Sequence, residues 1–322
     1  MSKLPVIVGF GGVNAAGRSS FHHGYRRLVI DALPQEKASR TYRSLAAVMG
    51  IPAEQAGDES QRQYMRDHTL IRKIEGNLFD TEQVAWNKRM ALSGAEGVLQ
   101  FVTRARDLPD VLPSGWEVKE LDGGKVSVSV NESCNVLPPT TRKIEVSTAG
   151  QLPTGFDPAS LYASRNHPRG LQMAICGASD ALKSMGIEWQ VVMDSIRPDQ
   201  MGVYASSAMA QLDDNGFGGL LGARANGGRV SSKQLALGLA DMPADFVSAY
   251  VLGNVGTSGP SLGACATFFY NLRQAVNDIR NGLTKVAVVG VAESGIDPRI
   301  IDGYYTMGAL ASAAELLKLD AE

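Results

Sequence analysis

The feature that most constrains this 322-residue chain is a run of small residues that ends at one cysteine and passes directly into a helical pattern. The run spans residues 259–264, and Cys265 follows it. Apolar residues then recur at spacings of three and four, which predicts that they share one face of a helix: Phe269, Leu272, Val276 and Ile279. The pair Asn281-Gly282 predicts the end of that helix.

A continuous apolar run at residues 285–292 comes next and is typical of a buried strand. Cys265 is therefore predicted to lie at a strand-to-helix turn, on the helix N-terminus. Free backbone amides and the helix dipole favour a thiolate at such a position. The position therefore indicates a nucleophile, and the alternative is a cysteine that packs in the core.

The other two cysteines, Cys134 and Cys176, are interpreted as structural and packing residues. Three cysteines form an odd number, they lie far apart, and they lack the Cys-x-x-Cys spacing of metal sites. This usage favours a reducing compartment over a disulfide or zinc framework, so we expect a cytoplasmic protein that holds no metal.

The composition excludes several classes of protein. A formal net charge of −2 gives no sign of a nucleic-acid or membrane-surface partner. Hydrophobic residues make up 44% of the chain, enough for a large core in one or two domains, yet no apolar run reaches the length of a membrane span. The opening residues do not resemble a signal peptide.

The first half of the chain has a mixed pattern. Val6–Phe10 predicts a short buried strand, followed by a glycine turn that only weakly resembles a dinucleotide loop, because Asn14 stands where a third glycine belongs. Strict alternation at Val126–Val130 predicts a half-exposed strand. Three segments with mixed apolar and charged faces predict helices, at residues 39–49, 61–74 and 81–90.

Several segments together resemble the β-ketoacyl-acyl carrier protein (ACP) synthases, the condensing enzymes of fatty-acid and polyketide synthesis. Gly-Pro-Ser at 259–261, Ala-Cys-Ala-Thr at 264–267 and Gly-Val-Ala-Glu at 290–293 are similar to the nucleophile region of that family. Residues 302–311 resemble a segment that lines its acyl pocket. The resemblance covers residues 5–17 and roughly 152–312.

The resemblance implies an α/β fold, the thiolase-like layered αβαβα arrangement, with a mixed five-stranded sheet and a buried nucleophile helix. Residues 1–322 would form its N-terminal half. Residues 21–150 are interpreted as an inserted helical and small β elaboration, similar to that of larger bacterial synthases that start chains from acetyl-CoA.

The implied reaction is the decarboxylative condensation of an acyl thioester, from acyl-CoA or acyl-ACP, with malonyl-ACP. Cys265 would accept the acyl group, ACP would be the partner, and no cofactor would be needed. In the family the strand before the cysteine, here about Pro260–Ala264, pairs with its two-fold mate, so a homodimer is expected. Phe268 and Tyr304 are the candidates for a short acyl pocket, whereas Phe269 is assigned to the buried helix face.

The histidines that stabilise the enolate in this family are missing from the pattern. All four histidines precede Cys265, and none is followed by Gly-Thr as in the family motif: His22, His23, His68 and His167. The catalytic histidines are therefore expected in a C-terminal half outside this chain. Two alternatives stay open, a thiolase-type acyltransferase and a non-catalytic scaffold. The known scaffolds of this kind, which set the chain length for a partner enzyme, lack the cysteine, so Cys265 argues against the second alternative.

Overall fold

The computed structural model describes residues 4–94, 97–293 and 295–321. The chain divides into two compact units, a larger one made of Met1–Phe79 with Glu145–Glu322 and a smaller one made of Asp80–Ile144. The smaller unit lies within the predicted elaboration, residues 21–150, whose boundaries stay a prediction.

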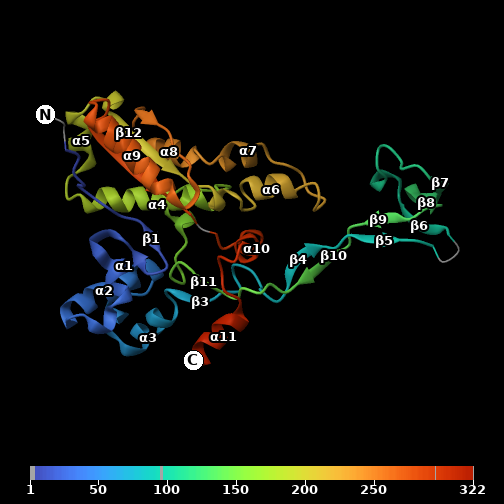
Figure 1. Ribbon diagram of the computed structural model, residues 1–322, viewed down its shortest axis with the longest axis horizontal. Coiled ribbons are helices and arrows are strands. Elements are labelled where there is room, and N and C mark those ends of the chain that lie inside the picture. Colours follow the sequence, from blue (N-terminus) through green and yellow to red (C-terminus); the bar gives the residue numbers. More distant parts are fainter. Residues whose placement is uncertain (1–3, 95–96, 294, 322) are drawn as a thin grey trace. The chain divides into compact units, whose positions relative to one another are not determined.

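Within the described residues the larger unit contains eleven α-helices and seven strands, and Figure 1 labels most of them. The elements before the smaller unit are β1 (Val13–Asn14), β2 (Gly17–Arg18), α1 (His23–Leu28), α2 (Gln35–Met49), α3 (Glu59–Asp67) and β3 (Ile71–Lys73). Those after it are β11 (Thr148–Gly150), α4 (Arg169–Ser184), α5 (Trp189–Ser195), β12 (Met201–Ser206), α6 (Phe217–Gly222), α7 (Ser232–Gly238), α8 (Met242–Val247), β13 (Thr257–Ser258), α9 (Thr267–Arg280), β14 (Val286–Val291), α10 (Pro298–Thr306) and α11 (Ala313–Ala321).

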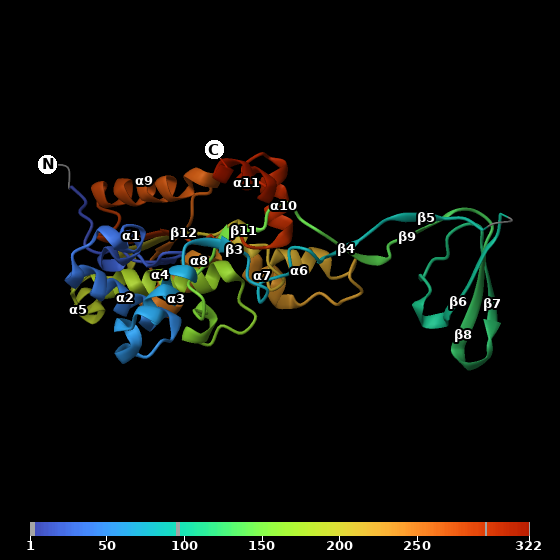
Figure 2. The same cartoon turned by 90° about the horizontal axis from the view of Figure 1, so that it is seen from below.

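A three-stranded parallel sheet in the order β13-β12-β14 forms the centre of the larger unit. β12 pairs with β14 from Met201↔Val286 to Ser206↔Val291, and every residue of β12 is buried. Helix α9 covers one face of this sheet, and α4 and α8 lie on the other (Figure 2). The layered α/β architecture is as predicted, but among the described residues the central sheet has three parallel strands, not a mixed set of five.

Helix α4 packs its apolar face into the core. Leu171, Ile175 and Ala178 recur at spacings of three and four and are all buried, and the half-buried Leu182 packs against the same cluster as Ala178. Gly186 follows the helix with φ +70°, the left-handed conformation that glycine adopts without steric strain. The core on this side of the sheet also contains Val203 and Val247.

The N-terminal segment differs from its prediction. Val6–Phe10 forms no strand, and Val6, Ile7 and Val8 are exposed, because no described strand pairs with this segment. The chain is anchored just beyond it, where the buried Asp180 carboxylate accepts hydrogen bonds from the Gly12 and Ser20 amides at 3.0 and 3.2 Å. Helices α1 to α3 follow, and α2 and α3 contribute Leu45 and Met65 to a separate apolar cluster.

The smaller unit is made of β-strands. A three-stranded antiparallel sheet in the order β6-β8-β7 buries Val126, Val128 and Val130 of β8, so the predicted alternation is confirmed. The helix predicted at 81–90 is wrong, because this segment forms strands that pair with residues far along the chain. The strands are β4 (Val84–Asn87), β5 (Met90–Leu92), β6 (Leu99–Arg104), β7 (Trp116–Leu121), β8 (Lys125–Val130), β9 (Cys134–Val136) and β10 (Pro139–Arg142).

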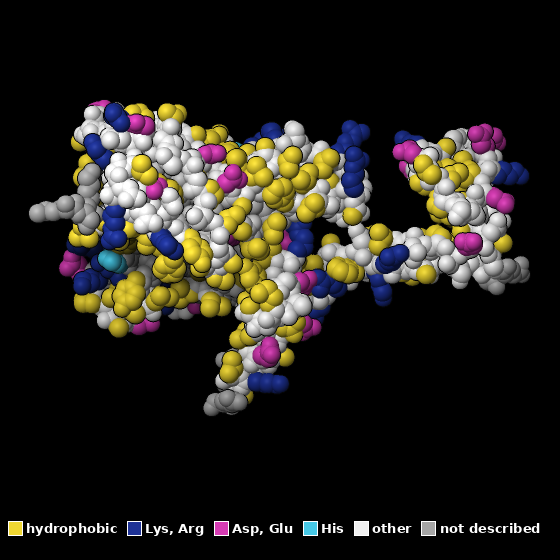
Figure 3. All heavy atoms as spheres, turned by 45° about the horizontal axis from the view of Figure 1, so that its top comes forward, with side chains coloured by type: hydrophobic (Ala, Val, Ile, Leu, Met, Phe, Trp, Pro, Cys, Tyr) yellow, Lys and Arg dark blue, Asp and Glu magenta, His cyan; other side chains and the backbone are white. Residues whose placement is uncertain are grey.

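No described helix is by itself long and apolar enough to cross a membrane. One bent pair, Ser232–Gly238 with Met242–Leu252, reaches the required length and composition only when its two parts are taken together. On the face drawn in Figure 3, side chains of both charges are scattered among apolar ones.

Candidate functional site

Cys265 is exposed and lies in a single 3-10 turn, Ala264–Ala266, that leads directly into α9. The prediction of a cysteine at the start of a helix is confirmed. The strand before it is shorter and earlier than predicted, because Thr257–Ser258 pairs with β12 and residues 259–263 form a loop. Ala264 has φ +47°, a left-handed conformation that is strained for a residue with a Cβ and that recurs at functional sites.

Two side chains on the buried face of α9 hold the cysteine loop. The Thr267 hydroxyl accepts a hydrogen bond from the Gly263 amide at 3.0 Å and donates one to the Ala264 carbonyl at 2.7 Å. The Asn271 carbonyl oxygen accepts one from the Ser261 amide at 2.6 Å, and its amide group lies 3.4 Å from the Gly290 carbonyl. The backbone on both sides of Ala264 is therefore fixed to the first turns of the helix.

Gly263 allows this loop to pass close to the helix. A Cβ at this position would lie 2.1 Å from the Tyr270 ring, so the ring packs where any larger residue would clash. Gly263 is thus needed for the packing of the loop itself, whereas a Cβ at Gly259, at the start of the run, would meet no atom within 4 Å.

Glu293 joins the ends of two strands at the same edge of the sheet. Its carboxylate oxygens accept hydrogen bonds from three successive amides after β12, those of Ala208, Met209 and Ala210, at 2.7, 2.9 and 3.1 Å. A carboxylate bound by three amides fixes the loop after β12 more firmly than neutral hydrogen bonds would. The Gly-Val-Ala-Glu motif at 290–293 therefore has a positional role in this structure.

The apolar residues predicted to form the buried face of α9 are not its most buried ones. Thr267, Asn271, Ala275 and Asp278 face the sheet, whereas Phe269 is 68% exposed. Leu272, Val276 and Ile279 flank this buried face and are half-buried. The sheet-facing side is thus rotated by about 100°, one residue of a helix, from the predicted one. The assignment of Phe269 to the core, and of α9 as a buried helix, is wrong for the described residues.

Phe268 and Tyr304 come from different helices. Phe268 lies in the first turn of α9 and packs edge-on against Phe269, with ring centroids 5.7 Å apart. Tyr304 lies on α10 and is half-buried. No ring contact among the described residues joins the two, so their shared place in an acyl pocket stays a prediction.

The other cysteines and the histidines lie in other surroundings. Cys134 is buried in the smaller unit, and burial raises the pKa of Cys176 to about 11, which keeps that thiol neutral. The contacts that the four histidines make within the described residues do not include Cys265. His167 is buried, with Nδ1 2.9 Å from the Tyr162 hydroxyl, and burial lowers its pKa.

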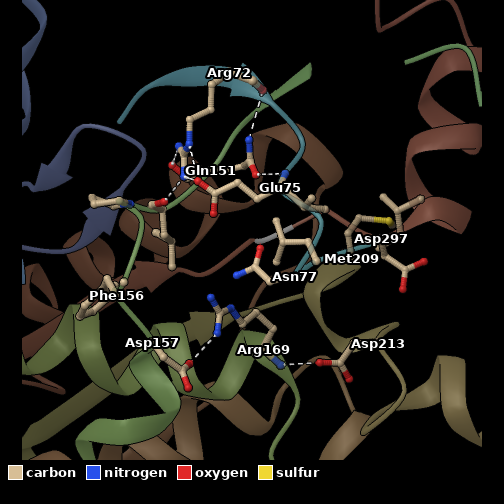
Figure 4. A pocket seen from close by; sticks show the side chains of 16 residues that line it. Arg72, Glu75, Asn77, Gln151, Phe156, Asp157, Arg169, Met209, Asp213 and Asp297 are labelled. Atoms are coloured by element: carbon tan, nitrogen blue, oxygen red, sulfur yellow. Dashed lines mark hydrogen bonds and ion pairs between the residues drawn. The ribbon is translucent and has the colours of Figure 1, made fainter. Parts of the chain in front are cut away.

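A cavity of about 440 Å³ lies close to the loop after β12, and Met209 contributes to its wall. Figure 4 shows the Arg169 guanidinium and the Asn77 amide pointing into it. Its charges are paired within the wall or at its edge: Arg72 with Glu75 at 2.9 Å, Arg169 with Asp157 at 3.1 Å and Asp297 with Arg299 at 2.6 Å. Burial raises the pKa of Asp213, which accepts the Arg169 amide at 2.8 Å. Cys265 does not line this cavity.

The described residues contain no cluster of histidine, cysteine and carboxylate side chains that could hold a metal ion. The sequence pattern predicted Cys265, but Thr267 and Asn271 were not predicted as the residues that hold its loop. Their signal was present, since a threonine and an asparagine four residues apart share one helix face.

Comparison with known proteins gives a consistent result. Residues 132–319 match the family model of the beta-ketoacyl synthase N-terminal domain. The chain is 46% identical over 328 aligned residues to the beta-ketoacyl-(acyl-carrier-protein) synthase FabY of Pseudomonas aeruginosa, covering 97% of this chain and 52% of the relative. It is 27% identical to fatty acid synthase 2 of Mycosarcoma maydis over 264 residues, 78% of this chain and 7% of that protein.

The structural comparison agrees. The crystal structure of the noncanonical ketosynthase FabY from P. aeruginosa superposes with a TM-score of 0.93 at 44% identity, over 100% of this chain and 53% of that one. The chain therefore spans about half the length of its FabY relative and shares the thiolase-like fold of that half. On this evidence the chain belongs to the β-ketoacyl synthase family and is of the FabY type.

Proposed function

We propose that this chain supplies the acyl-accepting part of a β-ketoacyl-ACP synthase in fatty-acid biosynthesis, with Cys265 as the nucleophile. The observation that supports this most directly is the exposed Cys265 in a strained turn at the start of α9, held there by Thr267 and Asn271. The name of the relative, a beta-ketoacyl-(acyl-carrier-protein) synthase, supports ACP as the partner.

In the proposed first step the Cys265 thiolate attacks the carbonyl carbon of an acyl thioester. The carbon–sulfur bond to the donor breaks, and the donor leaves as a thiolate while the acyl group stays on Cys265. Cys265 lies in the turn that leads into the N-terminus of α9, where the helix dipole stabilises negative charge. In the second step, loss of carbon dioxide from malonyl-ACP leaves an enolate that attacks the acyl-enzyme carbonyl and releases Cys265.

The second step needs groups that stabilise the enolate, and we place them outside this chain. The described contacts of His22, His23, His68 and His167 run to Phe10, Phe21, Tyr64 and Tyr162. The part of the relative that this chain does not span is where we expect the catalytic histidines. A thiolase-type acyltransferase and a non-catalytic scaffold are the alternative functions, and the setting of Cys265 argues for the synthase.

The test is acylation of the intact protein with radiolabelled acetyl-CoA, followed by mapping of the labelled peptide. We expect the acyl group on Cys265 and its loss in Cys265→Ser, whereas Cys176→Ser, the matched control, keeps full labelling. Label on Cys134 or Cys176, or a Cys265 thiol no more reactive than free thiol toward an acylating inhibitor, would favour the scaffold.

We propose a preference for short acyl groups, with acetyl-CoA as the candidate primer. The rings of Phe268 and Tyr304 would fill the acyl pocket and exclude a long acyl chain. Overpacking of this kind typically costs about 1–3 kcal/mol, which lowers the acylation rate roughly tenfold to a hundredfold. We therefore expect acetyl thioesters to acylate the intact enzyme faster than decanoyl thioesters, and Phe268→Ala or Tyr304→Ala to raise decanoyl use. Equal rates in the wild type, or no gain in either variant, would assign both rings to packing.

We also propose a cytoplasmic homodimer. Three free cysteines support a reducing compartment, and β13, at the edge of the central sheet, is the candidate strand for pairing with a second copy. Sedimentation of the intact protein at micromolar concentration should give the dimer mass, and a monomer mass there would count against the dimer.

A further inference from the structure

A second cavity, of about 450 Å³, runs along α4. The helix contributes Ile175, Cys176, Ser179, Asp180 and Lys183 to its wall, and this spacing forms one stripe along about 12 Å of the helix. Its volume lies in the range of small-molecule sites. Helices α4 and α9 cover opposite faces of the sheet (Figure 2), and Cys265 does not line this cavity.

Part of the cavity wall is apolar. Leu161, Tyr162 and Tyr250 contribute to the wall with Ile175 of α4, and the two tyrosine rings meet edge-on at 5.5 Å. Leu161 is 59% exposed and Tyr250 is 53% exposed, so apolar surface at the cavity remains open to water. Burial raises the pKa of Tyr162 as it does that of Cys176, so both groups stay neutral in this wall.

Another part of the wall is cationic. Both oxygens of the Asp180 carboxylate already have partners. The carboxylate forms an ion pair with Arg18 at 2.5 Å, and it accepts hydrogen bonds from the Ser20 hydroxyl at 2.9 Å and the Gly12 amide at 3.0 Å. Lys183 is exposed, and its ammonium group has no ion-pair partner among the described residues. Arg18, Asp180 and Lys183 together leave one net positive charge in this part of the wall.

We propose that this cavity binds a linear aliphatic chain that ends in one carboxylate. The chain would lie against Leu161, Tyr162 and Ile175, and the carboxylate would meet Lys183 and the partly exposed Arg18. The 440 Å³ cavity of Figure 4 does not suit such a ligand, because its wall holds more carboxylates than cations and these charges are already paired. A ligand on α4 would be a second occupant of the protein, additional to any acyl group on Cys265.

The experiment is equilibrium dialysis of radiolabelled decanoate against the full-length protein with Cys265 alkylated. We expect saturable binding that weakens about tenfold for each two methylenes removed from the chain. Decanol, which keeps the chain but lacks the charge, should bind about fivefold more weakly, and so should decanoate to Lys183→Met. Lys37→Met, an exposed lysine on α2 that does not line the cavity, is the matched control and should bind as the wild type does.

Two further variants test the apolar part of the wall and the volume. Leu161→Ser changes an exposed side chain, so it should fold normally and bind decanoate several-fold more weakly. Ser179→Phe fills the middle of the cavity and should abolish binding, with circular dichroism as the check on folding. Decanoate binding that is unchanged in Lys183→Met and Leu161→Ser, or equal for decanol and decanoate, would overturn the proposal. So would the absence of saturable binding to the wild type.

Discussion

Helices α4 and α9 lie on opposite faces of one sheet, yet they pack onto it with opposite chemistry. Helix α4 buries mainly apolar residues, and Leu171 among them is 0% exposed. Its two buried polar side chains, Gln172 and Asp180, bind the His167 carbonyl and the N-terminal segment. The buried face of α9 is polar apart from Ala275, and Asn271 on it is also 0% exposed. The apolar residues of α9 lie instead at its flanks and outer face, where Phe269 is largely in water.

The difference indicates a division of tasks. Apolar burial stabilises without fixing one geometry, whereas buried hydrogen bonds require particular partners at particular positions. On α9, Asp278 accepts the Tyr204 hydroxyl at 2.6 Å, and burial together with this hydrogen bond raises the pKa of Tyr204, which therefore remains a donor. Helix α4 thus contributes mainly stability, and α9 contributes the placement of Cys265.

The largest effect on stability is expected from Leu171→Ala on α4. Truncation of a fully buried leucine leaves a cavity and costs about 2–5 kcal/mol of the free energy of unfolding. Chemical denaturation measures this loss. Under native conditions, the rate at which iodoacetamide labels Cys265 should stay at the wild-type value. A large change in that rate would show that α4 also positions the thiol.

Thr267→Val on α9, unlike Leu171→Ala, should change the labelling rate of Cys265. The substitution keeps the shape but leaves the Gly263 amide and the Ala264 carbonyl without their partner, which costs about 1–3 kcal/mol. We expect a several-fold change in the Cys265 labelling rate beside this loss of stability. Thr267→Ser, which keeps the hydroxyl, is the control, and equal labelling rates in all three proteins would refute the positional role.

The smallest effect is expected from Phe269→Ser on the outer face of α9. Because the ring is 68% exposed, its removal should change the free energy of unfolding of this chain by no more than about 0.5 kcal/mol. A measured loss of several times this size would show that another segment or chain covers the outer face of α9 in solution.

Local patterns predicted the elements that local interactions determine. The alternation at Val126–Val130 gave β8, and the small residues before Cys265 gave the turn at the start of α9. The predicted helix at residues 39–49 is part of α2, although α2 begins earlier, at Gln35. Each of these patterns lies within a short stretch of the sequence, so it can be recognised without knowledge of the fold.

The errors occur where distant partners decide the outcome. The helix predicted over 61–74 ends at Asp67, and Ile71–Lys73 becomes β3 because it pairs with β11, far along the chain. Hydrophobic periodicity placed Phe269 on the buried face of α9, but the partners that bury Asn271 come from Ser206, Ser261 and Gly290. Hydrophobic periodicity takes no account of such polar partners, whose positions depend on the fold.

The parallel pairing of β12 with β14 has a consequence for how the chain folds. The two strands are distant in sequence, and the segment between them contains β13, the cysteine loop and α9. This pairing must close a long loop before it gains any hydrogen bonds, and such non-local contacts form slowly. The backbone that holds Cys265 should therefore be ordered late in refolding, so the reactivity of this one thiol reports the arrival of the native sheet.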